Sequence, residues 1–398
     1  MRAARAPWVW QVLAIFAASR IVTTTIFLVV ASLQGTSDRT GEHPGFLEFA
    51  SIWDGQWYWS INAYGYPGEI PRDANGVATE NAWAFMPVFP LLMRLFTIFG
   101  VPFPVVAPFV AMLFAGAAAL VFHRLMVRFL PAGSALFATA LFCFAPLSTI
   151  LQVSYAESMH LFLLFLALVL LVDRRYGLLM PVVVLMALTR PSGLAFALAL
   201  LLHLVHRFRT RERDPFPRRE RVEVIVVGLV SALSGVAWLL IAWAVTGEFT
   251  AYTDTELAWR RGFGVEGELI PFAPWVEGAQ FWFANWWGLP EPWLSVAAVA
   301  AVVAVAGGFA GFLLSPWAKR LGPDVRFWLA SYALYLLAVF FPQSSVFRLL
   351  VPLAPALGAL AVPRSRVWRV TLLVAAVAGQ VLWTYGLWRA DVYDWTPP

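Results

Sequence analysis

Long apolar stretches separated by short connections constrain the fold of this chain more than any other feature. A helix needs about 20 apolar residues to cross the hydrocarbon core of a bilayer, because only bonds within the helix can satisfy its backbone there. Such stretches recur throughout the sequence, and we predict about eleven spans: 8–33, 102–123, 132–152, 157–172, 176–190, 192–207, 222–246, 292–315, 326–341, 347–362 and 367–388. The sequence therefore predicts an all-α polytopic membrane protein, a single integral membrane domain over residues 1–398.

The composition agrees with this class. Hydrophobic residues make up 61% of the chain and charged residues 13%, whereas soluble domains carry about 25% charged residues. Met1 and the following arginines lead into the first apolar stretch without an A-x-A-like cleavage site, so we expect a retained first helix. The single Cys143 excludes an intrachain disulfide framework. The basic residues are spread between apolar segments, as membrane topology requires, so no nucleic-acid partner is expected.

Basic residues on alternate connections predict the orientation, because Lys and Arg concentrate in cytoplasmic connections. With the N-terminus inside, these connections hold Arg2 and Arg5, Arg124 and Arg128, Arg174 and Arg175, seven arginines from Arg207 to Arg221, Lys319, Arg320 and Arg326, and Arg364, Arg366 and Arg369. All are too short for a nucleotide-binding domain, and no P-loop or G-x-G-x-x-G stretch stands where it could work. We expect a multi-pass plasma-membrane protein with a cytoplasmic N-terminus and an extracytoplasmic active site.

Two long segments, 34–101 and 247–291, fall on the predicted outer face. Both are rich in Trp, Pro and Gly with interspersed acids. In the first, 46–64 and 84–99 have enough apolar residues to form helices that lie in the membrane interface. The tryptophans and phenylalanines of the second are typical of an aromatic belt.

Charged side chains near the bilayer are candidate functional residues, because burying a charge there is costly. Once the cytoplasmic charges and most loop charges are set aside, those that remain are Arg20, Glu48, Asp54, Arg94, Glu157, Arg190 and Arg348, with the loop group Asp254, Glu256, Arg260 and Arg261. In the predicted topology most lie at the outer ends of their spans, whereas Arg20 falls near the middle of the first. A single site on the outer face would produce this convergence.

Asp54 is the leading candidate for a general base. It lies among Trp53, Trp57 and Tyr58 just beyond the first span, and a partly desolvated carboxylate becomes a better proton acceptor. The alternative is an interfacial Asp that caps a short helix.

Glu157, Arg190 and Arg348 are candidate binding residues at predicted outer helix ends. Glu157 can bind a sugar hydroxyl or an arginine, or it can stabilise a helix N-terminus. The guanidinium groups of Arg190 and Arg348 suit a phosphate, because they donate paired hydrogen bonds; the alternative is an interfacial anchor or a structural ion pair.

Arg260 and Arg261 can contact a substrate phosphate or lipid headgroups. No second His stands at metal-ligand spacing from His160, and no D-x-D occurs. We therefore expect no metal and no cofactor.

The order of several motifs in the first half of the chain resembles the PIG-V family of mannosyltransferases, relatives of the second mannosyltransferase of GPI-anchor assembly. The motifs are Trp53-Asp54-Gly55-Gln56-Trp57-Tyr58, Gly65-Tyr66, Ala84-Phe85-Met86-Pro87-Val88-Phe89-Pro90-Leu91, Ser154-Tyr155-Ala156-Glu157-Ser158 and Thr189-Arg190-Pro191-Ser192-Gly193. The resemblance fades after about residue 200. Many alanines and arginines with the single lysine Lys319 favour a bacterial member.

The resemblance implies a membrane glycosyltransferase of the GT-C type. Polyprenyl-phosphate mannose would be its donor, and an acidic residue of the first outer loop, here Asp54, its base. We expect inversion at the anomeric carbon, with Arg190, Arg260, Arg261 or Arg348 on the phosphate and Trp53, Trp57 and Tyr58 against the sugar or the acceptor lipid. The acceptor would be a glycolipid or cell-envelope glycan.

Three alternatives remain. One is a transferase of arabinose or glucose from the same type of carrier. Another is a lipid-linked sugar flippase, which predicts polar residues through the middle of several helices and matched broken helices in two halves. The third is a non-catalytic subunit of a glycan assembly complex.

Overall fold

A computed structural model describes residues 7–261 and 270–391. Over these residues the chain is helical, with one isolated antiparallel bridge between Arg72 and Ala78. Arg2 and Arg5, which entered the predicted orientation, lie outside the described residues, as does 262–269 of the second outer segment.

The α-helices are α1 (Pro7–Ala31), α2 (Phe46–Phe49), α3 (Asp54–Tyr64), α4 (Val88–Thr97), α5 (Phe103–Met126), α6 (Ala132–Cys143), α7 (Glu157–Val172), α8 (Tyr176–Ala187), α9 (Gly193–Thr210), α10 (Arg218–Thr246), α11 (Ala251–Arg261), α12 (Ala273–Trp287), α13 (Trp293–Leu314), α14 (Pro316–Lys319), α15 (Gly322–Val339), α16 (Val346–Leu349), α17 (Leu357–Leu360) and α18 (Arg366–Trp383). Shorter helical turns are the 3₁₀ helices η1 (Ala82–Ala84), η2 (Ser148–Gln152) and η3 (Val351–Ala356), and the π-helical turn η4 (Thr384–Trp388).

Five helices of the described chain are long and apolar enough to cross a membrane. They are Trp8–Ala31, Phe103–Met126, Arg218–Thr246, Trp293–Leu314 and Arg366–Trp388. The expected count of about eleven spans is therefore not confirmed. Several predicted spans correspond to shorter apolar helices such as α7 and α8, which have 16 and 12 residues.

The predicted span 132–152 is wrong as a continuous helix. Helix α6 ends at Cys143, Pro146 lies in the break, and η2 follows. Proline lacks a backbone donor and its ring clashes with the preceding turn. Arg20 of α1 compensates: its guanidinium donates hydrogen bonds to the Cys143 carbonyl at 3.2 Å and to the Ser148 carbonyl at 3.0 Å. This charge near the middle of α1 therefore stabilises a broken helix.

The predicted span 347–362 is also interrupted. It divides into α16, η3 and α17. Pro352 and Pro355 cannot donate the bonds of a regular α-helix, so the chain takes up 3₁₀ turns between them. The first of these short helices, α16, carries Arg348.

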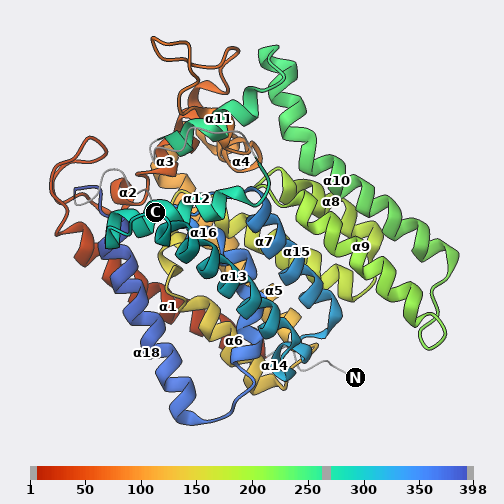
Figure 1. Ribbon diagram of the computed structural model, residues 1–398. Helices are drawn as coiled ribbons and strands as arrows, with labels where there is room; N and C mark the ends of the chain where they lie inside the picture. The colour runs from red at the N-terminus through yellow and green to blue at the C-terminus, as the bar shows by residue number, and fades with distance from the viewer. Residues whose placement is uncertain (1–6, 262–269, 392–398) are drawn as a thin grey trace.

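The short helices of the two predicted outer segments gather at one end of the bundle. Figure 1 shows α3, α4 and α11 together at the top, whereas α14 and the turn between α9 and α10 lie at the opposite end. The expected interfacial helix 46–64 is split into α2 and α3, because Trp53 adopts a left-handed φ of 57° between them. The expected helix 84–99 is α4, preceded by η1.

Helices α9 and α10 approach very closely beside this end. A Cβ atom built on Gly193 would lie 2.6 Å from the Gly235 backbone nitrogen, so neither position has room for a larger residue. The Ser231 hydroxyl adds a hydrogen bond of 2.8 Å to the Gly193 carbonyl. The contact holds the chain just after Arg190 against α10.

Candidate active site

A cavity of about 360 Å³ lies where the outer segments meet the long helices. Its wall comes from α3, η1, α7, the turn between α8 and α9, α10, α11, α15 and α16. Three carboxylates and three arginines line it among the described residues: Asp54, Glu157, Glu256, Arg190, Arg260 and Arg348. Residues separated by almost 300 positions in sequence thus share one chamber.

Asp54 is held in place through its backbone and its neighbour. It is the first residue of α3, where a negative side chain is favourable. The left-handed Trp53 before it is buried, and its indole nitrogen donates a hydrogen bond of 2.8 Å to the Trp388 carbonyl. The Asp54 amide lies 3.2 Å from the Tyr155 hydroxyl oxygen, to which it donates. These contacts fix the carboxylate at the cavity wall.

Arg348 connects two of the carboxylates. Its Nη1 donates a hydrogen bond to Oδ2 of Asp54, and its Nε lies 3.5 Å from Oε1 of Glu157. The guanidinium carbon also stands 5.1 Å from the ring centroid of Tyr155. Because Arg348 is buried, these carboxylates supply the negative charge that replaces water around it.

Glu157 and Arg190 form the second ion pair of this cluster. Glu157 begins α7, and its Oε1 lies 3.0 Å from Nη1 of Arg190. Arg190 precedes Pro191 in the break between α8 and α9, where the helix cannot continue. The cluster Asp54–Arg348–Glu157–Arg190 is balanced, with two negative and two positive groups.

Helix α11 forms the wall contributed by the second outer segment. Tyr252, Glu256 and Arg260 recur every four residues and all line the cavity. Nη2 of Arg260 donates a hydrogen bond of 2.6 Å to the Val339 carbonyl. Trp259 also lines the cavity, and its buried indole nitrogen makes no hydrogen bond.

Desolvation raises the pKa of the Glu256 carboxyl above its ordinary value, although a hydrogen bond with Tyr252 and the charges of Arg260 and Arg190 act in the opposite direction. Glu256 was a candidate charged residue without a predicted role, and Tyr252 and Trp259 were not among the candidates. The spacing of four residues that puts Tyr252, Glu256 and Arg260 on one helix face was the available signal.

Six of the nine predicted site residues line the cavity: Asp54, Tyr58, Glu157, Arg190, Arg260 and Arg348. Arg261 does not; its guanidinium turns to the first outer segment and donates a hydrogen bond of 2.6 Å to the Ala78 carbonyl. Adjacent residues on a helix point in different directions, so Arg260 and Arg261 cannot share one role.

Trp53 and Trp57 also lie outside the cavity. Trp53 packs in the core with Arg39 4.5 Å from its ring centroid. Trp57 stacks on Phe85 at 5.8 Å and meets Trp259 edge-on, also at 5.8 Å. Both therefore support residues of the wall, and the aromatic side chains that reach the cavity include Tyr58, Phe85 and Trp259.

Within the described chain, no group of three or more His, Cys, Asp or Glu side chains could hold a metal ion. The acids of the cavity are instead interleaved with arginines. Whether the chain acts without metal stays a prediction.

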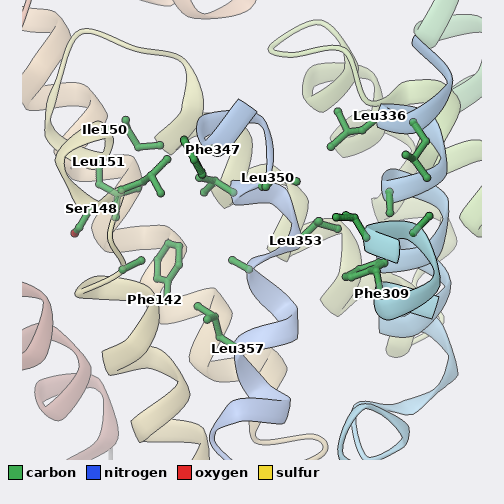
Figure 2. Close-up of a pocket in the computed structure, with 18 of the residues that line it drawn as sticks. Phe142, Ser148, Ile150, Leu151, Phe309, Leu336, Phe347, Leu350, Leu353 and Leu357 are labelled. Atoms are coloured by element: carbon green, nitrogen blue, oxygen red, sulfur yellow. The ribbon is translucent and has the colours of Figure 1, made fainter. Parts of the chain in front are cut away.

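An apolar groove of about 480 Å³ lies beside the cavity. Figure 2 shows Phe142, Ile150 and Leu151 on one side, Phe309 and Leu336 on the other, and residues of the 347–357 segment between them. A second apolar pocket of about 520 Å³ shares Trp275, Val305 and Phe347 with it. Leu336 and Val351 line both the first groove and the cavity. At these positions the apolar groove and the charged cavity are separated by a single residue.

Comparisons with known proteins do not show a family. No family model matches the chain, and no curated protein matches it. Among solved structures the chain is similar to the Archaeoglobus fulgidus oligosaccharyltransferase tethered with an acceptor peptide, at 12% identity and a TM-score of 0.45. The match covers 95% of this chain and 55% of that one. A likeness of this size carries no argument about fold or activity, and membership of the PIG-V family stays a prediction.

Proposed function

We propose that this protein is a membrane glycosyltransferase that takes a sugar from a polyprenyl-phosphate carrier. The observation that carries the proposal is the chamber in which Asp54, Glu157, Arg190 and Arg348 meet directly beside an apolar groove. A polyprenyl-phosphate sugar has the matching parts: a long hydrocarbon, an anionic phosphodiester and a polar sugar. Mannose as the sugar rests on the resemblance to the PIG-V motifs.

The groove suits the carrier chain, because its lining is almost wholly hydrocarbon and aromatic. The phosphate of a carrier in the groove would enter the cavity past Leu336 and Val351, which line both spaces. The nearest arginine along the chain is Arg348, three residues before Val351, and Arg260 faces the same cavity. A phosphodiester between guanidinium groups gains charge-assisted hydrogen bonds.

Asp54 is the proposed base. Its oxygen Oδ2 accepts a hydrogen bond from Arg348, which holds the carboxylate in place and leaves the second oxygen for the hydroxyl of an acceptor. The acceptor oxygen attacks the anomeric carbon opposite the phosphate, and the configuration inverts. Arg348 touches the base and stands beside the proposed phosphate position, so one side chain aligns both reacting ends.

The flippase alternative predicts polar residues through the middle of several helices. Among the described residues such a cluster surrounds Arg20, whose guanidinium donates hydrogen bonds to Cys143, Ser148 and Gln152. Arg20 itself lines neither the cavity nor the two apolar pockets. The charged side chains that line the cavity gather instead at one end of the bundle. This distribution favours chemistry at an end over passage through the middle.

The test is transfer by purified protein in lipid nanodiscs, supplied with radiolabelled polyprenyl-phosphate mannose and a bacterial lipid extract. We expect Asp54→Asn to lower the rate by about 10²- to 10⁴-fold, the usual contribution of a general base. Asp73→Asn is the matched control, because Asp73 lies in an exposed turn away from the cavity. Asp54→Glu keeps a carboxylate that can pair with Arg348. Comparing it with Asp54→Asn separates loss of the base from loss of folding.

Equal transfer by wild type and a folded Asp54→Asn protein would remove Asp54 from the role of base. Transfer from a polyprenyl-phosphate arabinose or glucose, but not from the mannose donor, would contradict the sugar assignment. No transfer from any lipid-phosphate sugar would contradict the proposed function itself.

A further inference from the structure

Glu256 differs from the other two carboxylates of the cavity. Asp54 forms an ion pair with Arg348, and Glu157 forms one with Arg190. Within the described chain Glu256 has no such pair; its partner is the phenol of Tyr252, one turn earlier on α11. The residue therefore projects into the same chamber with a neutral hydrogen-bond partner.

The protonation of Glu256 sets the net charge of the cavity lining. The Asp54–Arg348–Glu157–Arg190 cluster is neutral, and Arg260 is the third arginine in the lining. With the His160 imidazole of the lining neutral, the whole lining is neutral when Glu256 is ionised and carries one positive charge when Glu256 is protonated. A phosphodiester is a monoanion, so its binding favours the protonated form of Glu256.

The surroundings of Glu256 work in the same direction. Burial raises the pKa of its carboxyl, and the opposing influences are the Tyr252 hydrogen bond and the positive charges of Arg260 and Arg190. Tyr335 of α15 lines the same cavity and interacts with Glu256 as a neutral phenol. A bound phosphodiester would occupy the arginines and weaken their influence on the carboxyl.

We propose that Glu256 carries a proton when the donor binds and gives it to the departing phosphate. This role rests on the proposed function. In the step, the bond between the anomeric carbon and the phosphate oxygen breaks and its electron pair stays on that oxygen. The carboxyl proton of Glu256 moves to the phosphate, while the acceptor oxygen bonds to the anomeric carbon and its proton moves to Asp54. Glu256 ends ionised and Asp54 protonated, and exchange with water restores both.

The two carboxylates thus divide acid and base work according to their partners. Asp54 is held in an ion pair with Arg348, and its carboxylate is the proposed base. A phenol in place of an arginine leaves Glu256 able to hold a proton, which an acid requires. Enzymes commonly give two carboxyl groups different acid and base roles through different surroundings.

The pH dependence of turnover tests the acid role. We expect wild-type kcat to fall on the alkaline side as the Glu256 carboxyl loses its proton. Glu256→Gln keeps the shape and hydrogen-bonding capacity of the side chain but cannot give up a proton, so kcat should drop by about 10- to 100-fold and the alkaline fall should disappear. Glu277→Gln is the matched control, because Glu277 lies near Arg260 from α12 but does not line the cavity.

A donor with a less basic leaving group separates this role from a structural one. Fluorine substituents on the carrier carbons next to the phosphate lower the basicity of the departing phosphate. Such a donor should restore most of the rate of Glu256→Gln and little of the rate of Asp54→Asn. If Glu256 had only a structural role, Glu256→Gln would be as slow with the fluorinated donor as with the ordinary donor.

Two failures are distinguishable. If wild type transfers no sugar from any lipid-phosphate donor, the proposed function fails and the acid role fails with it. If wild type transfers sugar, but Glu256→Gln matches Glu277→Gln in rate, pH profile and leaving-group dependence, the proton role alone is overturned.

Discussion

At the scale of single residues, Arg348 has the most demanding position. It is buried, donates to Asp54, lies 3.5 Å from Glu157 and stands over the Tyr155 ring at 5.1 Å. A planar guanidinium can meet two carboxylates and an aromatic face at once, whereas an ammonium is a compact point charge. A lysine at this position could not make all of these contacts at once.

Arg348→Lys should keep the net charge of the cavity but lose the alignment of Asp54. We expect the rate of sugar transfer to fall on the order of 10- to 100-fold, because a small misplacement of reacting groups lowers a rate by about this factor. Arg128→Lys is the matched control, since Arg128 pairs with Asp173 at the opposite end of the bundle. Thermal unfolding of both variants should stay close to that of wild type; a folded Arg348→Lys protein with full activity would contradict the alignment role.

Much of this residue-scale picture could be predicted and part could not. Asp54, Glu157, Arg190 and Arg348 stand out in the sequence because each is a charge at the edge of an apolar stretch. Their pairing is not readable, since Asp54 and Arg348 lie 294 positions apart. Glu256 was a candidate charge without a predicted role. Trp53 and Trp57 were assigned to the site because a sequence shows aromatic residues but not which way they point.

At the scale of elements, the breaks between helices create the site. The left-handed Trp53 starts α3 at Asp54, the break at Pro191 exposes Arg190, and the short helix α16 presents Arg348. Hydrophobic periodicity locates helices but not such interruptions, which explains why 132–152 and 347–362 were each predicted as one span. The prolines in both segments were the signal.

The crossing of α9 and α10 gives a prediction at this scale. Gly193→Ala places a Cβ atom 2.6 Å from the Gly235 backbone, so the helices must separate. We expect a loss of about 1–3 kcal/mol in the free energy of unfolding, as for other overpacked sites, with lower activity because Gly235 lines the cavity. Gly177→Ala in α8, where nothing lies within 4 Å of the added atom, should be neutral or stabilising. Equal thermal unfolding of the two variants would contradict the close approach.

At the scale of the whole molecule, the helices α3 and α11, which line the charged cavity, and the basic turn between α9 and α10 occupy opposite ends of the bundle (Figure 1). The cavity belongs to the end with α3, α4 and α11, and Arg174, Arg207 and Asp214 form ion pairs at the other. The sequence predicts that the first of these ends faces away from the cytoplasm. This orientation is accessible to a direct measurement.

Thiol labelling in intact cells checks the orientation. The native Cys143 is fully buried, so it should give no background. A membrane-impermeant thiol reagent should label Asp73→Cys, in the first outer segment, and should label Glu212→Cys only after the cells are opened; both positions are exposed. The reverse pattern would put the cavity on the cytoplasmic side and exclude the proposed site of reaction.

Helix α13 leaves one side of the apolar groove exposed to the surroundings of the protein. Ala298 is its one buried residue among those described, and Val305, 61% exposed, lines the apolar groove together with Phe347, 51% exposed. The groove is therefore open sideways to whatever surrounds the protein, and in a cell that is the acyl chains of neighbouring lipids. The bilayer then completes the wall of a groove that the chain leaves open, so a detergent that preserves every helix can still remove part of the proposed carrier site.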